Sequence, residues 1–311
     1  MRKLFYGVDE DNKTLLQVFR EHNEQSRKLI GKDFVSKTVQ RYETTTRYLE
    51  EFIKKEYQLS DIALNNLEAN FISKFDAFLK IEKGCAQNSA ITRLKNLKKI
   101  IRIALENDWI KKDPFAYYRF KLEETDPKFL TMDEIKIILA KEFTIKRVEQ
   151  VRDVFIFCVF TGLAFSDVKD LSPEHLVKDN KGELWIRKNR QKTKIMCNIP
   201  VLPVATSILE KYKNVAECTG KLLPVLSNQR MNSYLKEIAD VCGLQKNLCT
   251  HSARHSYATS ICLANGVSME NVAKMLGHAD TSVTKHYARV LDQNIFKDMQ
   301  KVNSCLSELA T

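Results

Sequence analysis

A short polar break near residue 126 does most to limit the folds open to this chain. The stretch Thr125–Lys128 contains Pro127, which cannot continue a helix because it lacks an N–H and its ring clashes with the preceding turn. Thr131 and Glu134 follow with the spacing of a capping box, in which each side chain satisfies a free backbone N–H. One helical region therefore ends before this break, and a new helix begins just after it.

We expect two domains, because 311 residues are enough for two separate hydrophobic cores. Residues 14–126 are predicted to be a helical domain, in which Thr38–Tyr57 and Ala90–Asn107 are the clearest amphipathic helices. Residues 127–311 are predicted to combine a helix near 148–163, a β-hairpin from Glu183 to Pro200, and further helices. The expected fold class is mainly α with a small β-hairpin or sheet. Residues 1–13 look like a linker or a truncated N-terminal region.

One predicted helix carries many basic side chains. In Ala90–Asn107 the apolar residues face inward, and the other faces carry Arg93, Lys95, Lys98, Lys99 and Arg102. A solvated helix face would explain this run of charge. Contact with DNA phosphates would explain it as well, and would make binding salt-dependent because each contact releases counterions. The net charge of +11 favours a polyanionic partner without identifying it.

Cysteine usage and hydropathy predict a cytoplasmic protein. The eight cysteines include no C-x-x-C pair, and several lie in apolar runs, as expected for free thiols in a reducing compartment. Met1-Arg2-Lys3 leads into no long apolar segment, so no signal peptide is expected. The apolar run Val154–Phe160 is too short to span a bilayer. We expect no membrane association.

The most informative segment is Thr250–Tyr257. Thr250 is predicted to be the N-cap of a helix, which places His251 and Arg254 on one face near its N-terminus. A histidine and an arginine there suit phosphate binding, because Arg can bind two phosphate oxygens at once. His251 and His255 also have the spacing of a helical zinc pair, but Ser252 stands where that motif needs glutamate. A structural His–Arg pair beside a core is the other alternative.

Two later motifs make a chemical role more specific. Leu276-Gly277-His278 is followed by Tyr287, nine residues after His278. The ordered set H-x-x-R, L-G-H and Tyr resembles the tyrosine recombinase (phage integrase) family, and is similar to integrases of conjugative transposons. The resemblance covers essentially the whole chain. It implies a helical core-type DNA-binding domain followed by a catalytic domain.

The resemblance also implies the roles of individual residues. Tyr287 would be the nucleophile, and His251, Arg254 and His278 would contact the scissile phosphate or exchange protons with it. The family has a catalytic lysine in a β-hairpin, and the pattern R-x-K-T assigns that role to Lys192, with Lys188 and Lys194 as alternatives. No metal or cofactor is implied. The expected partners are double-stranded DNA and further copies of the chain, as a monomer when free and a synaptic tetramer on DNA.

One position departs from the family pattern. The family has T-G-L-R followed three residues later by an acid, whereas this chain has Thr161-Gly162-Leu163-Ala164 followed by Asp167. The acid matches but the arginine is absent. Arg152 is one candidate to replace it, although a straight helix would place Arg152 roughly 18 Å away. The alternative is a catalytically weak DNA-binding protein.

The C-terminal segment has an apolar stripe of its own. Within Leu291–Leu309 the stripe contains Ile295, Met299, Val302, Leu306 and Leu309. Packing onto its own domain would explain it, and so would an exchange helix that docks on a neighbouring protomer. A relaxing topoisomerase of related chemistry is a further alternative function.

Overall fold

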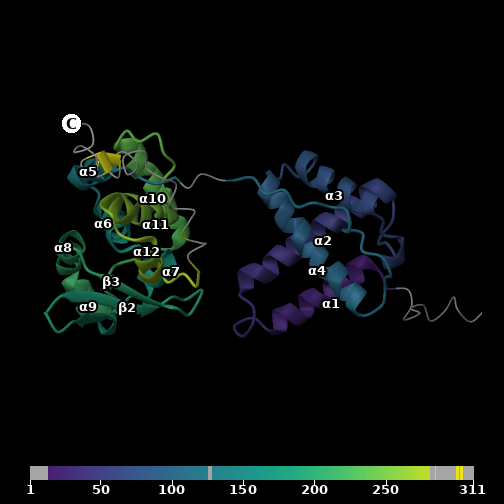
Figure 1. The fold of residues 1–311 in the computed structure, drawn as a ribbon, viewed down its shortest axis with the longest axis horizontal. Coiled ribbons are helices and arrows are strands. Elements are labelled where there is room, and N and C mark those ends of the chain that lie inside the picture. The colour runs from purple at the N-terminus through teal and green to yellow at the C-terminus, as the bar shows by residue number, and fades with distance from the viewer. Residues whose placement is uncertain (1–12, 125–127, 281–283, 285–298, 301, 304–311) are drawn as a thin grey trace, which may run out of the picture. The chain divides into compact units, whose positions relative to one another are not determined.

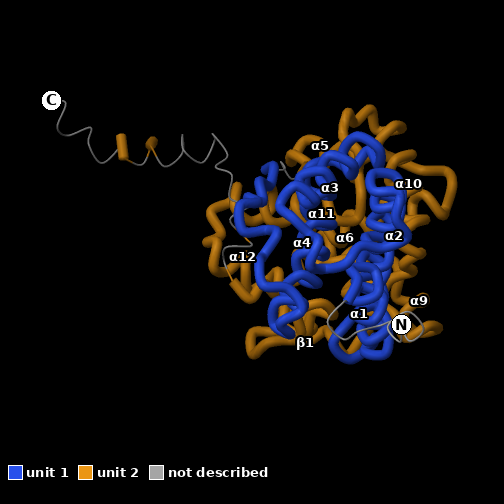
Figure 2. Tube along the Cα trace, turned by 90° about the vertical axis from the view of Figure 1, so that its right-hand side faces the viewer, with its two compact units in different colours: residues 1–125 blue, residues 126–311 orange. Residues whose placement is uncertain are grey.

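The chain forms two compact units, residues 1–125 and residues 126–311 (Figure 2). The computed structural model describes residues 13–124, 128–280, 284, 299–300 and 302–303. Tyr287 and most of the predicted C-terminal helix lie outside the described residues. Each unit has a hydrophobic core of its own.

Unit 1 is helical, as its periodicity predicts (Figure 1). The predicted helices Thr38–Tyr57 and Ala90–Asn107 correspond to α2 and α4. Aromatic side chains dominate the core, where Phe52 contacts Phe71, Phe75 and Phe78 at ring-centroid distances of 5.2–5.4 Å. The elements of this unit are α1 (Leu15–Lys28), α2 (Ser36–Tyr57), the 3-10 turn η2 (Leu64–Asn66), α3 (Ala69–Ile81) and α4 (Gln87–Glu106).

Unit 2 is built around one buried helix. The apolar run near Val154 lies in α6 (Lys146–Thr161), which is buried on nearly all sides and contacts α8, α10 and α11. A helix that is apolar all round requires such a position. The helices of this unit are α5 (Met132–Ala140), α6, α7 (Phe165–Lys169), α8 (Pro203–Lys211), α9 (Lys213–Thr219), α10 (Asn228–Val241), α11 (Thr250–Ser256) and α12 (Met269–Leu276).

A three-stranded antiparallel sheet completes unit 2, in the order β1 (Leu176–Lys178), β2 (Leu184–Asn189), β3 (Met196–Pro200). The predicted hairpin is thus confirmed as β2 and β3, and β1 adds a strand too short to predict. Ile186 pairs with Ile199, and both are fully buried. Because side chains alternate across a strand, Lys188 shares the face of Ile186. Arg190 follows directly after the end of β2.

The start of unit 2 is held by side chains from distant segments. The predicted capping box is present, since Glu134 N–H donates to Thr131 Oγ1 and Thr131 N–H to Glu134 Oε2. Leu130, fully buried, donates its N–H to Ser256 Oγ at 2.9 Å, and its carbonyl accepts from Ser260 Oγ at 2.5 Å. Ser260 lies in a π-helix, η4 (Tyr257–Cys262), which continues α11. The chain entering unit 2 is therefore bonded directly to the helix that carries His251 and Arg254.

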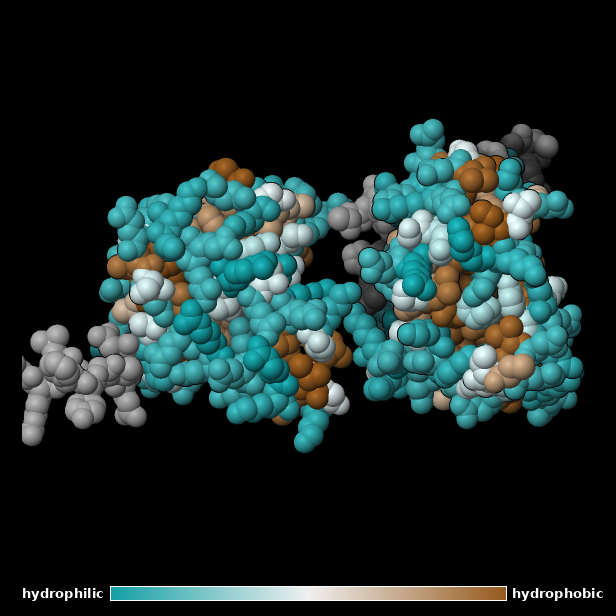
Figure 3. Space-filling model, turned by 180° about the vertical axis from the view of Figure 1, so that it is seen from behind, coloured by the Kyte–Doolittle hydropathy of each residue, from teal (hydrophilic) through white to brown (hydrophobic). Residues whose placement is uncertain are grey.

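Hydrophilic side chains predominate on the face of both units that Figure 3 shows, with hydrophobic side chains in separated patches. Among the helices that the structure describes, none is both long and apolar enough to cross a membrane. Two shorter elements complete the described fold, the 3-10 turns η3 (Pro173–His175) and η5 (Leu263–Asn265).

Candidate active site

Arg254 lies at the centre of the candidate site. Its side chain is only 2% exposed, and its guanidinium donates to the carbonyl oxygens of Gly162 at 2.8 Å and Leu276 at 2.5 Å. The same guanidinium contacts Nε2 of His278 at 3.0 Å. The T-G-L, H-x-x-R and L-G-H motifs, far apart in the sequence, therefore meet at this one side chain.

Two glycines make this convergence possible. Gly162 ends α6 with φ +69°, and a Cβ there would lie 2.3 Å from the ring of Tyr257. Gly277 ends α12 with φ +62°, and a Cβ there would lie 2.7 Å from Cys197 Sγ and 2.8 Å from Arg190 Cδ. Both positions combine a left-handed backbone with a contact too close for any side chain. The glycines in the T-G-L and L-G-H motifs thus have a steric explanation.

His278 is held in one tautomer. Arginine can only donate, so Nε2 of His278 must accept the bond from Arg254, and the proton of the neutral ring must be on Nδ1. Nδ1 then donates to Oγ1 of Thr284 at 2.8 Å, a fully buried residue three positions before Tyr287. Burial, with the positive charges of Arg254 and Arg190, lowers the pKa of His278 to about 4. The ring is therefore neutral near pH 7.

His251 lies at the surface of the site. Its side chain has an exposed edge, and its ring packs edge-on against His255 at a centroid distance of 4.4 Å. Partial burial of the ring lowers the pKa of His251, and the charges of Arg254, Arg190 and Lys192 lower that pKa further. A neutral imidazole in such a place can accept a proton. The exposed edge of the His251 ring is open to a group that gives up a proton.

The predicted N-cap of the helix that carries His251 is wrong. α11 begins one residue earlier, with Thr250 as its first residue and Cys249 as the N-cap. Thr250 Oγ1 donates instead to Asn228 Oδ1 at 3.0 Å, and Thr250 N–H donates to Asn232 Oδ1 at 2.9 Å. The side chains of α10 thus compete successfully for the hydroxyl that a local pattern assigns to a cap.

Lys192 lies in the turn between β2 and β3, exposed, and close enough for its charge to lower the pKa of His251. Thr193 Oγ1 donates to the carbonyl of Gly277 at 3.2 Å, which ties this turn to the L-G-H motif. Lys188 points to a different place, where its Nζ donates to the Asp170 carbonyl at 3.2 Å and lies 3.1 Å from Nε2 of His175. These contacts favour Lys192 over Lys188.

Arg152 does not fill the place of the absent arginine. Its guanidinium pairs with Asp153 at 2.6 Å and donates to the carbonyls of Ile138, Leu139 and Lys141 at 3.0–3.3 Å, at the C-terminal end of α5. α6 runs without a break from Arg152 to Thr161, so no fold-back brings this side chain to Ala164. Arg152 stabilises the junction between α5 and α6.

Arg190, which none of the sequence motifs singles out, also lies close to Asp167 and Gly277. Its side chain is 12% exposed, and its Nε lies 3.7 Å from Oδ2 of the buried Asp167. Oδ1 of Asp167 accepts from Gln191 N–H at 2.9 Å. The signal that could have indicated Arg190 is the acid itself, since a buried Asp167 without its expected arginine requires another cation nearby.

The basic side chains of α4 do not form a single stripe. Arg93 and Lys99 flank α2, where Arg93 donates to the Arg41 carbonyl at 3.2 Å and Lys99 Nζ lies 5.1 Å from the ring centroid of Tyr42. Lys98 lies over Phe115 and Phe120, at 5.6 and 5.3 Å. Arg102 pairs with Glu106 at 3.1 Å, and Lys95 is exposed. DNA contact by this set stays a prediction.

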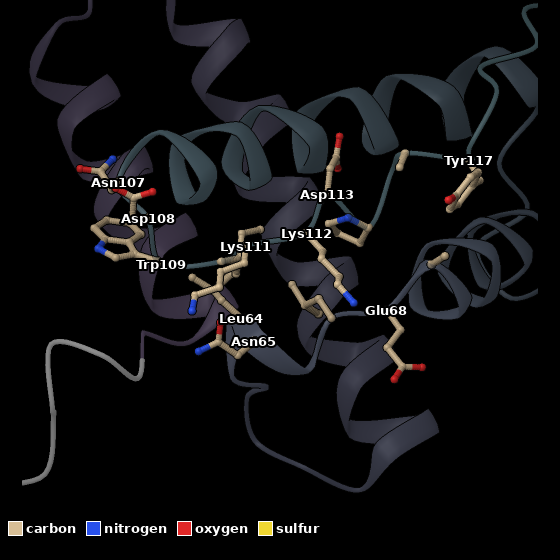
Figure 4. Close-up of a pocket in the computed structure, with 15 residues that line it drawn as sticks. Leu64, Asn65, Glu68, Asn107, Asp108, Trp109, Lys111, Lys112, Asp113 and Tyr117 are labelled. Carbon is tan, nitrogen blue, oxygen red and sulfur yellow. The ribbon is translucent and has the colours of Figure 1, made fainter.

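Unit 1 also contains a cavity of about 1140 Å³, lined by residues near Leu64 and by the segment from Asn107 to Tyr117 (Figure 4). Its lining mixes apolar, acidic and basic side chains, and includes none of the candidate catalytic residues. No cluster of three or more metal-ligating side chains occurs within the part of the chain that the structure describes.

Comparison with known proteins agrees with this arrangement. Residues 14–122 match the phage integrase SAM-like domain, and residues 128–294 match the phage integrase family. The chain is 26% identical to tyrosine recombinase XerD of Listeria monocytogenes, covering 88% of this chain and 94% of the relative. It is 24% identical to tyrosine recombinase XerC of Leptospira interrogans, covering 90% and 93%.

Solved structures show the same fold. A lambda integrase dimer bound to a COC' core site matches with a TM-score of 0.71 at 19% identity, covering 90% of this chain and 98% of that one. The Tn1549 transposon integrase in complex with a circular intermediate DNA matches with a TM-score of 0.70 at 16% identity, covering 93% and 99%. The predicted fold class, mainly helical with a small sheet, is confirmed.

Proposed function

Because this chain belongs to the phage integrase family of tyrosine recombinases, we propose that it cuts and rejoins DNA at specific sites through a covalent bond to Tyr287. The observation that carries this proposal is the meeting of three separate motifs at Arg254, with two neutral imidazoles and a lysine around it. A basic pocket of this kind suits a phosphodiester, whose reaction adds negative charge at the phosphorus.

The chemistry assigns one step to each group. The phenol oxygen of Tyr287 attacks phosphorus, and the bond from phosphorus to the 5′ oxygen breaks. His251 accepts the phenol proton, which is otherwise lost only near pH 10. Lys192 donates a proton to the departing 5′ oxygen. The product is a 3′-phosphotyrosyl bond and a free 5′ hydroxyl, and the reverse sequence rejoins the strand without ATP.

Arg254 acts on the phosphate itself, and His278 positions Arg254. Arg254 stabilises charge on the non-bridging oxygens, and the two carbonyls that it binds fix the guanidinium before substrate arrives. His278 keeps its Nδ1 proton toward Thr284, so it orients Arg254 through Nε2. A pre-oriented donor costs no reorganisation during the reaction, which is why such groups contribute strongly.

Unit 1 would bind the DNA duplex around the cleavage site. Its match to the phage integrase SAM-like domain supports this role, and so does the net charge of +11 of the whole chain. Lys95 and Arg102 are the exposed members of the basic set on α4 and are available to phosphates. We place this activity on DNA in the bacterial cytoplasm, at the nucleoid.

Recombination needs more than one copy of the chain. The matched structures include a lambda integrase tetramer bound to a Holliday junction. By this likeness we propose that four protomers assemble on two DNA sites, each cutting one strand. The segment Leu291–Leu309 would dock on a neighbouring protomer, so deleting the residues after 292 should weaken assembly and spare binding to a single site.

A covalent-trapping experiment tests the proposal. A nicked duplex carrying the recognition site loses a short strand after cleavage, so the protein–DNA adduct accumulates. Wild type should give a DNA-linked band, Tyr287→Phe should give none, and Tyr117→Phe, which alters a 90% exposed phenol, should behave as wild type. An adduct of equal yield from Tyr287→Phe would refute the assignment.

The same preparation separates the other functions. Binding with no adduct from wild type would identify a DNA-binding protein on this fold. Relaxation of supercoiled DNA without preference for a site would identify a topoisomerase. Binding should also weaken by orders of magnitude between low and moderate salt, because each phosphate contact releases counterions.

A further inference from the structure

The acid that follows the family's T-G-L-R pattern is present here as Asp167, although Ala164 stands in place of the arginine. Ala164 is the N-cap of α7 and offers only a methyl group. Asp167, on the first turn of that helix, is 2% exposed. A carboxylate so deeply buried is costly unless it is hydrogen-bonded and paired with a cation. Besides a 3.4 Å hydrogen bond from the neighbouring Ser166 Oγ, the partners of Asp167 come from the β2–β3 hairpin.

Asp167 binds two successive residues of that hairpin. Its Oδ1 accepts the N–H of Gln191 at 2.9 Å, and its Oδ2 lies 3.7 Å from Nε of Arg190. The second distance is short enough for an ion pair but too long for a hydrogen bond. Within the described residues Nε has no hydrogen-bond partner. The carboxylate thus holds the Arg190 guanidinium near the site without using its Nε–H.

Arg190 lies directly against the L-G-H turn. A Cβ on Gly277 would be 2.8 Å from Arg190 Cδ and 2.9 Å from its Cγ, so only glycine allows this approach. The next residue is His278. The charge of Arg190 contributes to the lowered pKa of His278 and to that of His251. The guanidinium therefore acts electrostatically on both imidazoles of the candidate site.

We propose that Arg190 is a catalytic residue that contacts the scissile phosphate, supplying the guanidinium that Ala164 lacks, with Asp167 as its positioning residue. This inference rests on the proposed function. Arg254 is already bonded to two carbonyls and His278, whereas Arg190 approaches the pocket from the hairpin that also carries Lys192. A second guanidinium can bind two phosphate oxygens at once, which a lysine cannot do.

Single-turnover cleavage of the nicked substrate provides the first test. Arg190→Ala should cut more slowly by roughly 10³-fold, the scale of effect of a transition-state arginine, with DNA binding nearly unchanged. Arg190→Lys should recover only part of the rate. Arg187→Ala, which removes an exposed arginine of β2 from the same hairpin, should cut as wild type.

A rescue variant and an NMR titration give two further readouts. Arg190→Ala combined with Ala164→Arg should regain at least about tenfold in rate, because Asp167 can then hold a guanidinium from its own helix. In Arg190→Ala the pKa values of His251 and His278 should both rise, whereas those of His22 and His175 should not move. The titration needs no DNA, so it reports the position of Arg190 independently of activity.

Each failure has a distinct meaning. If wild type forms no Tyr287-dependent adduct, the proposed function falls and the catalytic role of Arg190 falls with it. If wild type forms the adduct and Arg190→Ala forms it at the same rate, only the role of Arg190 is refuted. The cleavage rate of Arg190→Ala could also fall together with its folding stability, without recovery on adding Ala164→Arg. That result would show that Arg190 only stabilises the hairpin, and it would refute the catalytic role as well.

Discussion

The two histidines of the site gain their chemistry from their surroundings. Both have a pKa below the ordinary value, to about 4 for His278, because burial and the neighbouring cations disfavour the imidazolium. Both are therefore neutral at pH 7. A neutral His251 can accept a proton, and a neutral His278 can accept the bond from Arg254.

This predicts the acid limb of the pH profile. A group with a lowered pKa keeps its base form below pH 6.5 and loses it only as the pH falls through the lowered value. The ratio kcat/KM for cleavage reports the free protein. We expect kcat/KM to stay high at pH 6.5 and to decrease only when the pH falls through the lowered pKa values. A limb centred at or above pH 6.5 would contradict the neutral-imidazole arrangement, and His175→Gln should leave the limb in place.

Substitution of Gly277 can distinguish the cost of backbone strain from the cost of a steric clash. Gly277→Ala places a methyl 2.7 Å from Cys197 Sγ and 2.8 Å from Arg190 Cδ, on a backbone with φ +62°. Gly243→Ala has nearly the same backbone, φ +66°, with no atom within 4 Å. Urea unfolding should show about 1 kcal/mol of destabilisation for Gly243→Ala and a clearly larger loss for Gly277→Ala. Equal losses would mean that the close approach is relaxed in solution.

The β2–β3 hairpin carries two of the cations around the site and is fixed at both sides of its turn. Asp167 holds Gln191, and Gly277 holds Thr193, so Lys192 lies between two anchored residues. Lys188, four residues before Lys192 and within β2, is engaged by His175 and the Asp170 carbonyl. In this hairpin Lys188 therefore has a structural role, whereas Lys192 is available to a leaving group.

A change of leaving group tests the role of Lys192. Lys192→Ala should slow cleavage of normal DNA by roughly 10²–10⁴-fold, the usual contribution of a general acid. A substrate whose 5′ bridging oxygen is replaced by sulfur needs no proton on departure, so it should restore the rate of this variant. Lys188→Ala should show no such rescue. Failure of the sulfur substrate to rescue Lys192→Ala would assign the proton to another group.

The elements themselves differ in how far the sequence predicts them. α2, α4, the capping box of α5 and the hairpin follow from periodicity and local hydrogen bonding, and each occurs within a few residues of its predicted place. The N-cap of α11 does not, because Asn228 and Asn232 on α10 take the Thr250 hydroxyl and N–H. β1 is three residues long and depends on pairing with β2 for its existence.

The site follows the same division. His251, Arg254, His278 and Lys192 lie in motifs that the resemblance identifies. Arg190 was missed and Arg152 was proposed, because the choice depends on which guanidinium the fold brings to Asp167. The spacing of residues along the sequence does not give the distance in the folded protein between a guanidinium and Asp167. The uninterrupted α6 removes Arg152, and the turn of the hairpin supplies Arg190.

The two units have separate cores, so the whole chain should unfold in two steps. Ser256→Ala together with Ser260→Ala would leave the buried N–H and C=O of Leu130 without their hydroxyl partners. Each lost partner costs about 1–3 kcal/mol. Calorimetry should show the transition of unit 2 lowered by about 2–4 °C per kcal/mol, and that of unit 1 unchanged.

Ser207→Ala is the matched control, because its exposed hydroxyl donates to a carbonyl within α8. It should leave both transitions in place. If the double serine variant lowered both transitions together, the two units would be unfolding as one, and the anchoring of Leu130 could not be assigned to unit 2 alone.

Arg254 meets its partners from residues 162, 276 and 278, so no single stretch of the polypeptide contains a working pocket. A chain still leaving the ribosome, or a fragment released by a protease, carries some of these groups but not their arrangement. Cleavage of DNA therefore requires a chain that has been synthesised through Tyr287 and has folded.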